Sequence, residues 1–223
     1  MQTIQLTPEV LATTPGELVV AVVNETNRQV NEKGLADPVA VSEFVLAADA
    51  LNLTRLIWRL REEWGEEAVE QPLVRQLKAE TCRARGYNPD EFESAMQAVR
   101  KRARLPFGWS AVDLASVRAR RNPIRLLDPE LATSTLAAAV ANVARHLQRI
   151  QSEKAILLPI EQLRATFGVR KIVVSGTVSR LIDAGVLRCV DESYHTGKAK
   201  EYAFTGKEHE HYEEVAVTPA GAA

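Results

Sequence analysis

Apolar positions along residues 1–150 recur at intervals of three and four, the spacing of amphipathic helices. Two helix starts carry a capping side chain followed by proline, at Thr14-Pro15 and at Asn88-Pro89. The second predicted helix is apolar on more than one face, so we expect it at the centre of a bundle. The pattern predicts helices at residues 15–30, 40–64, 67–85, 89–105, 111–121 and 129–150.

The helix predicted at 129–150 has one continuous apolar stripe. Its members are Leu136, Val140, Val143, Leu147 and Ile150. Alanines between them permit another helix to approach closely. We therefore interpret this segment as the first helix of a C-terminal unit, or as its connection to the bundle, and its alanines as a candidate dimer contact.

The pattern changes after residue 155. Short apolar runs with strand character alternate there with two helical segments. In chain order we predict strand, helix, turn, helix, strand, polar tip and strand, at residues 156–159, 161–167, 168–169, 171–184, 186–190, 192–198 and 201–204.

The helix predicted at 171–184 has an apolar face and a polar face. Val174, Val178, Leu181 and Ile182 are spaced to pack inward. Hydroxyl, guanidinium and ammonium groups donate to phosphates and base edges, and glycine permits close approach of a backbone. The candidate DNA-binding residues on this helix and on the following tip are Arg170, Lys171, Ser175, Gly176, Thr177, Ser179, Arg180, His195, Lys198 and Lys200.

The phrase Leu181-Ile-Asp-Ala-Gly-Val-Leu187 resembles the end of the recognition helix in winged helix-turn-helix proteins. This resemblance to the superfamily covers about residues 135–205. The spacing of Gly-Val, Val-Ser and Gly-Val-Leu is also loosely similar to that in winged helices of replication and mobile-element proteins. It implies that one helix enters the major groove of DNA. Such helices usually begin with Ser, Thr or Asp, whereas the residues at this start are Arg170 and Lys171. A cation at the start of a helix opposes the helix dipole. Either the helix starts elsewhere, or bound phosphate offsets this cost.

Charge is distributed unevenly along the chain although the formal net charge is −1. Residues 1–99 hold 9 Lys/Arg and 16 Asp/Glu, a balance of −7, whereas residues 100–125 hold 8 and 1, a balance of +7. The basic block 100–125 has two interpretations of similar weight. Its cations either contact phosphate or stabilise helix C-termini and pair with the acidic helices.

Other chemistry is not indicated by the sequence. No P-loop, dinucleotide-binding glycine motif, nucleophile elbow or zinc-protease motif is present, and we expect no catalytic site and no cofactor. His209 and His211 alone do not make a metal site. Cys82 and Cys189 are expected as reduced thiols in the cytoplasm. No apolar run approaches the ~20 residues of a membrane span, and the first residues lack a secretory signal pattern.

The sequence thus predicts a mainly α protein: a helical bundle domain at 1–125, a winged helix-turn-helix domain with its lead-in helix and a small β-hairpin wing at 126–206, and a flexible tail at 207–223. The predicted function is double-stranded DNA binding in transcriptional regulation or in plasmid or mobile-element replication, with the bundle providing a homodimer or protein contact. The alternative is a non-enzymatic adaptor or structural subunit whose winged helix and acidic bundle bind protein partners.

Overall fold

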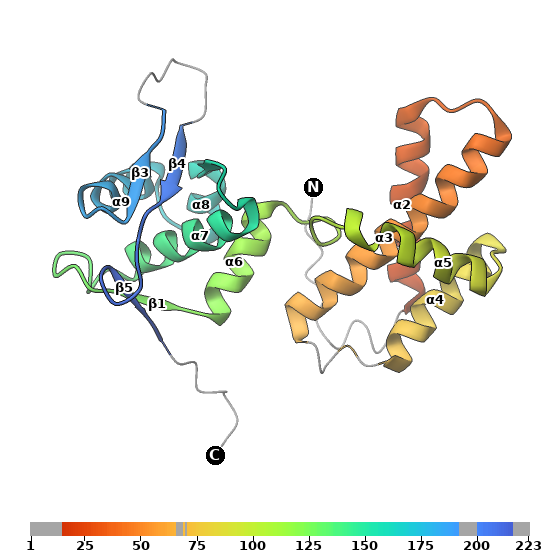
Figure 1. The fold of residues 1–223 in the computed structure, drawn as a ribbon, viewed down its shortest axis with the longest axis horizontal. Helices are drawn as coiled ribbons and strands as arrows, with labels where there is room; N and C mark the ends of the chain where they lie inside the picture. The colour runs from red at the N-terminus through yellow and green to blue at the C-terminus, as the bar shows by residue number, and fades with distance from the viewer. Residues whose placement is uncertain (1–14, 66–68, 70, 192–199, 216–223) are drawn as a thin grey trace. The chain divides into compact units, whose positions relative to one another are not determined.

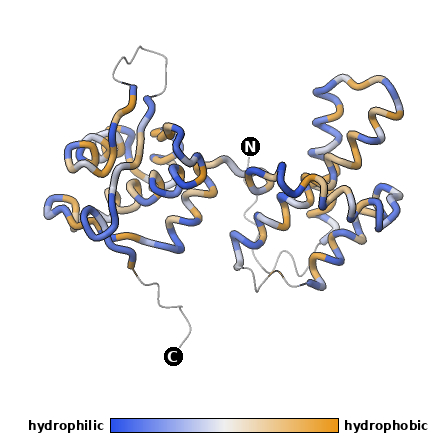
Figure 2. The backbone as a smooth tube through the Cα atoms, in the orientation of Figure 1, coloured by the Kyte–Doolittle hydropathy of each residue, from blue (hydrophilic) through white to orange (hydrophobic). Residues whose placement is uncertain are grey.

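The computed structural model describes residues 15–65, 69, 71–191 and 200–215. The protein is mainly helical, with small antiparallel sheets. It divides into two compact units, an N-terminal unit of residues 1–109 and a C-terminal unit of residues 110–223 (Figure 1). Apolar and polar residues alternate along the helices of both units (Figure 2), as expected for helices that bury one side.

Helices alone form the described part of the N-terminal unit. They are α2 (Pro15–Lys33), α3 (Pro38–Trp64), α4 (Gln71–Arg85), α5 (Pro89–Val99) and the 3-10 turn η1 (Arg100–Arg102). The Asn88 side chain caps α5, as its sequence predicts, by accepting hydrogen bonds from the backbone N–H groups of Asp90 and Glu91. Thr14, the other predicted cap, lies outside the described residues.

Helix α3 lies at the centre of this unit, as predicted, and packs against α2, α4 and α5. Leu53, Leu56 and Leu60 of α3 are buried in one core with Leu77 of α4 and Phe92 of α5. This explains why α3 is apolar on more than one face: each face has a helical neighbour.

The C-terminal unit mixes helices with short strands. In chain order they are α6 (Ala111–Arg121), β1 (Ile124–Leu126), α7 (Thr135–Gln151), β2 (Ile156–Leu157), α8 (Ile160–Phe167), α9 (Lys171–Asp183), β3 (Leu187–Cys189), β4 (Glu201–Phe204) and β5 (Tyr212–Glu214). Strands β2, β4 and β3 form an antiparallel sheet in that order, and β1 pairs with β5.

Helix α7 is the core of the C-terminal unit. Ala137, Ala141 and Ala144 are fully buried, and the helix packs against α6, α9, β1 and β4. These three alanines are therefore covered within the unit and not available to a partner, whereas Ala138 and Ala139 are only partly buried. The predicted dimer contact through this helix stays a prediction. Helix α7 also begins at Thr135, after a cap by Ser134, rather than at the predicted Pro129.

The boundary between the units lies before α6, whereas the sequence placed it at 125. Val112, Ala115 and Ala119 of α6 belong to the core of the C-terminal unit. The Asn142 side chain of α7 also donates hydrogen bonds of 2.8 Å to the carbonyls of Ala119 and Asn122 at the end of α6. These contacts join segments about 20 residues apart, so local sequence signals at Pro123 did not reveal them.

The segment predicted as a flexible tail contains strand β5, so that prediction is wrong for residues 212–214. Tyr212 is buried, and the guanidinium of Arg145 lies 5.2 Å from the centre of its ring. Arg145 also donates a hydrogen bond of 2.6 Å to Glu214. The buried cation and the ring hold a strand that its acidic composition did not suggest.

Candidate nucleic-acid interface

Helices α8 and α9 are joined by a tight turn at Gly168. Gly168 has φ of +66°, a left-handed conformation that favours glycine, and its N–H closes the end of α8 on the carbonyl of Arg164. Helix α9 starts at Lys171 after Arg170, whose side chain makes no capping hydrogen bond. The turn and the uncapped, basic helix start both agree with their predictions.

One face of α9 packs into the core. Val174, Val178 and Leu181 are buried, and Ile182 is partly buried against the same cluster. The predicted apolar stripe is confirmed. It fixes which residues of α9 face solvent.

The outward face of α9 is small and polar at its middle. Ser175, Gly176 and Ser179 are exposed. Apart from the backbone of α9 itself, no atom lies within 4 Å of the position that a Cβ would take at Gly176, so this part of the helix is open to an approaching surface. These three candidates lie where the sequence predicted.

Thr177 is a correction to the predicted interface. It is only 7% exposed, and its hydroxyl donates a hydrogen bond of 2.9 Å to the carbonyl of Val173. Thr177 lies three residues after Val174 and four before Leu181, so helix geometry places it on the buried face. Its prediction as a DNA contact is therefore wrong.

The cations of α9 make contacts within the unit. Lys171 pairs with Glu161 of α8 at 3.0 Å, with both side chains more than half exposed. Arg180 donates a hydrogen bond of 2.6 Å to the carbonyl of Glu130. Hydrogen bonds from Arg164 and then from Lys171 lower the pKa of Glu161. Because both side chains are exposed to solvent, this ion pair is screened and contributes little to stability.

A groove of about 580 Å³ runs between α9 and the sheet; we call it the α9–sheet groove. It is lined by Leu158, Pro159, Ile160, Glu161, Lys171, Ser175, Val178, Ser179, Ile182, Cys189, Lys200 and Tyr202. The groove thus brings Lys171, Ser175 and Ser179 of α9 together with Lys200, which directly precedes β4. Predicted residues from two separate segments therefore share one surface. The remaining tip candidates, His195 and Lys198, lie outside the described residues.

Two apolar residues at the start of α9 were not predicted as surface residues. Ile172 is 74% exposed and Val173 is 39% exposed. The helical period contains the signal, because Ile172 lies opposite the buried Val174 and Leu181. The sequence argument chose the polar members of this face and passed over Ile172.

The basic block 100–125 is divided between the two units. Arg100, Lys101 and Arg102 are exposed on η1 in the N-terminal unit. In the C-terminal unit Arg125 pairs with Glu213 of β5 at 2.8 Å, so one member of the block pairs internally.

Among the described residues, no group of three or more His, Cys, Asp or Glu side chains is arranged to hold a metal ion. Within the same residues, no helix is long and apolar enough to cross a membrane. Cys82 is buried and Cys189 partly buried, both as free thiols, and burial raises the pKa of Cys82.

A scan against models of protein families found no match, and searches of curated proteins and of solved structures found no significant similarity.

Proposed function

We propose that the protein binds double-stranded DNA through its C-terminal unit, acting as a winged helix-turn-helix in transcriptional regulation or in replication of a plasmid or mobile element. The observation that carries the proposal is the α9–sheet groove, where exposed serines and a lysine of α9 meet Lys200 beside β4. The chain order of the elements, α7, β2, α8, α9, β3 and β4, supports the proposal because it matches the order predicted for a winged helix.

In this proposal α9 lies in the major groove. Its 13 residues give a length of about 20 Å, and its small outward residues let its backbone approach the base edges. Ser175 and Ser179 supply donors and acceptors for bases, while Arg170 and Lys171 contact phosphates at the helix start. Lys200, with His195 and Lys198 of the tip, contacts the backbone beside α9.

Phosphate binding also explains the basic start of α9. Arg170 and Lys171 oppose the positive end of the helix dipole, whereas a phosphate at that end interacts favourably with both the cations and the free N–H groups. Lys171 then exchanges Glu161 for phosphate. Because both members of that pair are exposed, the exchange costs little.

The test is fluorescence anisotropy with mixed-sequence duplex DNA at several salt concentrations. We expect salt-sensitive binding, and a Lys171→Gln/Lys200→Gln variant should reduce the slope of log affinity against log salt by roughly 0.9 per lysine that contacts phosphate. Lys207→Gln is the matched control, because Lys207 is also an exposed lysine of this unit in an ion pair, with Glu210 at 3.1 Å. Absence of binding at low salt, or equal loss in both variants, would reject the proposal.

The second candidate is an adaptor that binds protein, and the exposure of Ile172 and Val173 favours it. Apolar side chains at the start of α9 suit a protein surface better than phosphate. In this case Ile172→Gln abolishes self-association or partner binding while the Lys171→Gln/Lys200→Gln variant retains it. Sedimentation velocity of these variants measures the homodimer version directly.

A further inference from the structure

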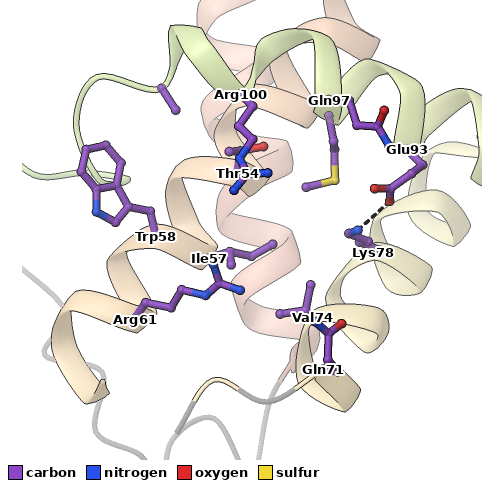
Figure 3. A pocket seen from close by; sticks show the side chains of 12 residues that line it. Thr54, Ile57, Trp58, Arg61, Gln71, Val74, Lys78, Glu93, Gln97 and Arg100 are labelled. Carbon is purple, nitrogen blue, oxygen red and sulfur yellow. Dashed lines mark hydrogen bonds and ion pairs between the residues drawn. The ribbon is translucent and has the colours of Figure 1, made fainter. Parts of the chain in front are cut away.

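The N-terminal unit contains a hollow of about 410 Å³ between α3, α4 and α5, which we call the bundle hollow (Figure 3). It is lined by Thr54, Ile57, Trp58, Arg61, Gln71, Val74, Lys78, Glu93, Met96, Gln97, Arg100 and Ala103. This volume lies within the range of about 300–1,000 Å³ typical of small-molecule sites. None of the lining residues belongs to the proposed DNA interface, so the hollow calls for its own explanation.

The floor of the bundle hollow is apolar. Ile57 of α3, Val74 of α4 and Met96 of α5 are each buried, and each comes from a different helix. The indole of Trp58 stands at one side, held by a hydrogen bond of 3.1 Å from its N–H to Glu62. A flat apolar group placed here would contact Ile57, Val74 and the thioether of Met96.

The rim of the bundle hollow is positively charged. Arg61 of α3, Lys78 of α4 and Arg100 of η1 oppose a single carboxylate, Glu93, which gives the lining a net charge of +2. Figure 3 shows the side chains of Arg61 and Arg100 extending toward the middle of the hollow from two different elements. Lys78 is held by Glu93 at 2.5 Å. This local excess of cations is notable because residues 1–99 as a whole carry −7.

We propose that the bundle hollow binds a small organic anion, a phosphate or carboxylate attached to a flat apolar group. Guanidinium groups bind such anions with paired hydrogen bonds, and the amides of Gln71 and Gln97 supply further donors. The anion lies between Arg61 and Arg100, and the apolar group covers Ile57 and Met96. A polyanion such as DNA would use the same cations but not the buried floor.

Trp58 provides the readout. In a full-length Trp64→Phe/Trp109→Phe variant it is the only tryptophan, since the chain contains three. Phenyl phosphate is the probe, with phenol and inorganic phosphate as its two halves. We expect a saturable change in Trp58 fluorescence with phenyl phosphate and a much weaker response to either half. Calorimetric titration of the unsubstituted protein repeats the measurement without the tryptophan replacements.

Arg100→Gln and Lys101→Gln form the decisive pair of variants. Both residues are exposed cations of the same turn, but only Arg100 lines the hollow. Loss of a charged hydrogen bond predicts that Arg100→Gln weakens phenyl phosphate binding roughly fivefold or more. Lys101→Gln should change it less than about twofold.

Three results would overturn the proposal. They are no saturable binding, equal weakening by the two substitutions, and equal affinity for inorganic phosphate and phenyl phosphate. Competition by duplex DNA, with the same Arg100 dependence, would reassign the cations to nucleic acid. None of these results depends on the C-terminal unit, so this inference and the proposed DNA interface are tested separately.

Discussion

His146 of α7 is a buried titratable residue in the core of the C-terminal unit. Its Nε2 has no hydrogen-bond partner among the described residues. Burial, followed by the charges of Arg145, Arg149 and Arg118, lowers the pKa of His146 to about 4, while Glu214 acts in the opposite direction. The folded protein therefore binds this proton less readily than the unfolded chain, whose histidine titrates near 6.5.

The consequence is a loss of stability in mild acid. The contribution of neutral His146 is fully present above pH ~6.5 and decreases as the pH falls toward about 4, by up to about 3 kcal/mol. Urea unfolding of the protein at a series of pH values measures this dependence, and His146→Gln should flatten it. His209→Asn is the control, because His209 is exposed and asparagine tolerates its φ of +62°. An unchanged slope in His146→Gln would contradict the assignment.

At the residue scale, helix periodicity predicts which side chains of α9 face the core, and the one wrong assignment ignored this periodicity. The inward positions Val174, Val178 and Leu181 follow from spacing alone. Thr177 was assigned to the outward face because it is polar, although the same spacing places it inside. The partners of Lys171 and Arg180 lie outside α9, on α8 and in the segment before α7, so the pattern within α9 did not indicate them.

At the scale of elements, the turn between α8 and α9 depends on one glycine. Gly168 has φ of +66° and no atom within 4 Å of an added Cβ, so Gly168→Ala is strained by the backbone alone. We expect it to destabilise the C-terminal unit by about 1–2 kcal/mol. Thermal unfolding followed by circular dichroism measures the change.

Gly176→Ala is the matched substitution within α9 itself. Gly176 has ordinary helical geometry and equally open surroundings, so alanine should stabilise the helix by about 0.5–1 kcal/mol. If α9 lies against DNA, the same substitution lowers DNA affinity while it raises stability. A stability change of the same sign at both glycines would contradict the conformations assigned to them.

Element prediction followed the strength of the local signal. Helices α3 and α9 carry long periodic patterns and were located to within two residues. Helix α5 begins at the predicted Pro89, next to its capping residue, but ends at Val99, six residues before the predicted end. Strand β5 is short and acidic, and its pairing with β1 spans about 90 residues of chain, so its stability comes from Tyr212 and Arg145 rather than from strand propensity. Such a strand cannot be predicted from its own residues, because the residues that stabilise it lie elsewhere in the chain.

At the scale of the whole molecule, each unit contains its own buried core. The C-terminal unit, with α6 included, should therefore fold alone as residues 110–223. A shorter fragment that begins at residue 126, the boundary taken from the sequence, lacks Val112, Ala115 and Ala119 and exposes the side of α7 that they cover. We expect cooperative thermal unfolding for the first fragment and aggregation or a broad transition for the second.

The fragment of residues 110–223 also tests which part of the basic block contacts DNA. Residues 110–223 retain Arg118, Arg120, Arg121 and Arg125 but lack the exposed cations of η1. If DNA contacts are confined to the C-terminal unit, the fragment and the full chain should have DNA affinities within about threefold and equal salt slopes. A slope lower by roughly 0.9 for each lost contact would instead assign phosphate binding to residues 100–104. A full chain with a steeper salt slope than the fragment, and an Arg102→Gln/Arg104→Gln full-chain variant with the lower slope of the fragment, would establish a DNA contact in the N-terminal unit.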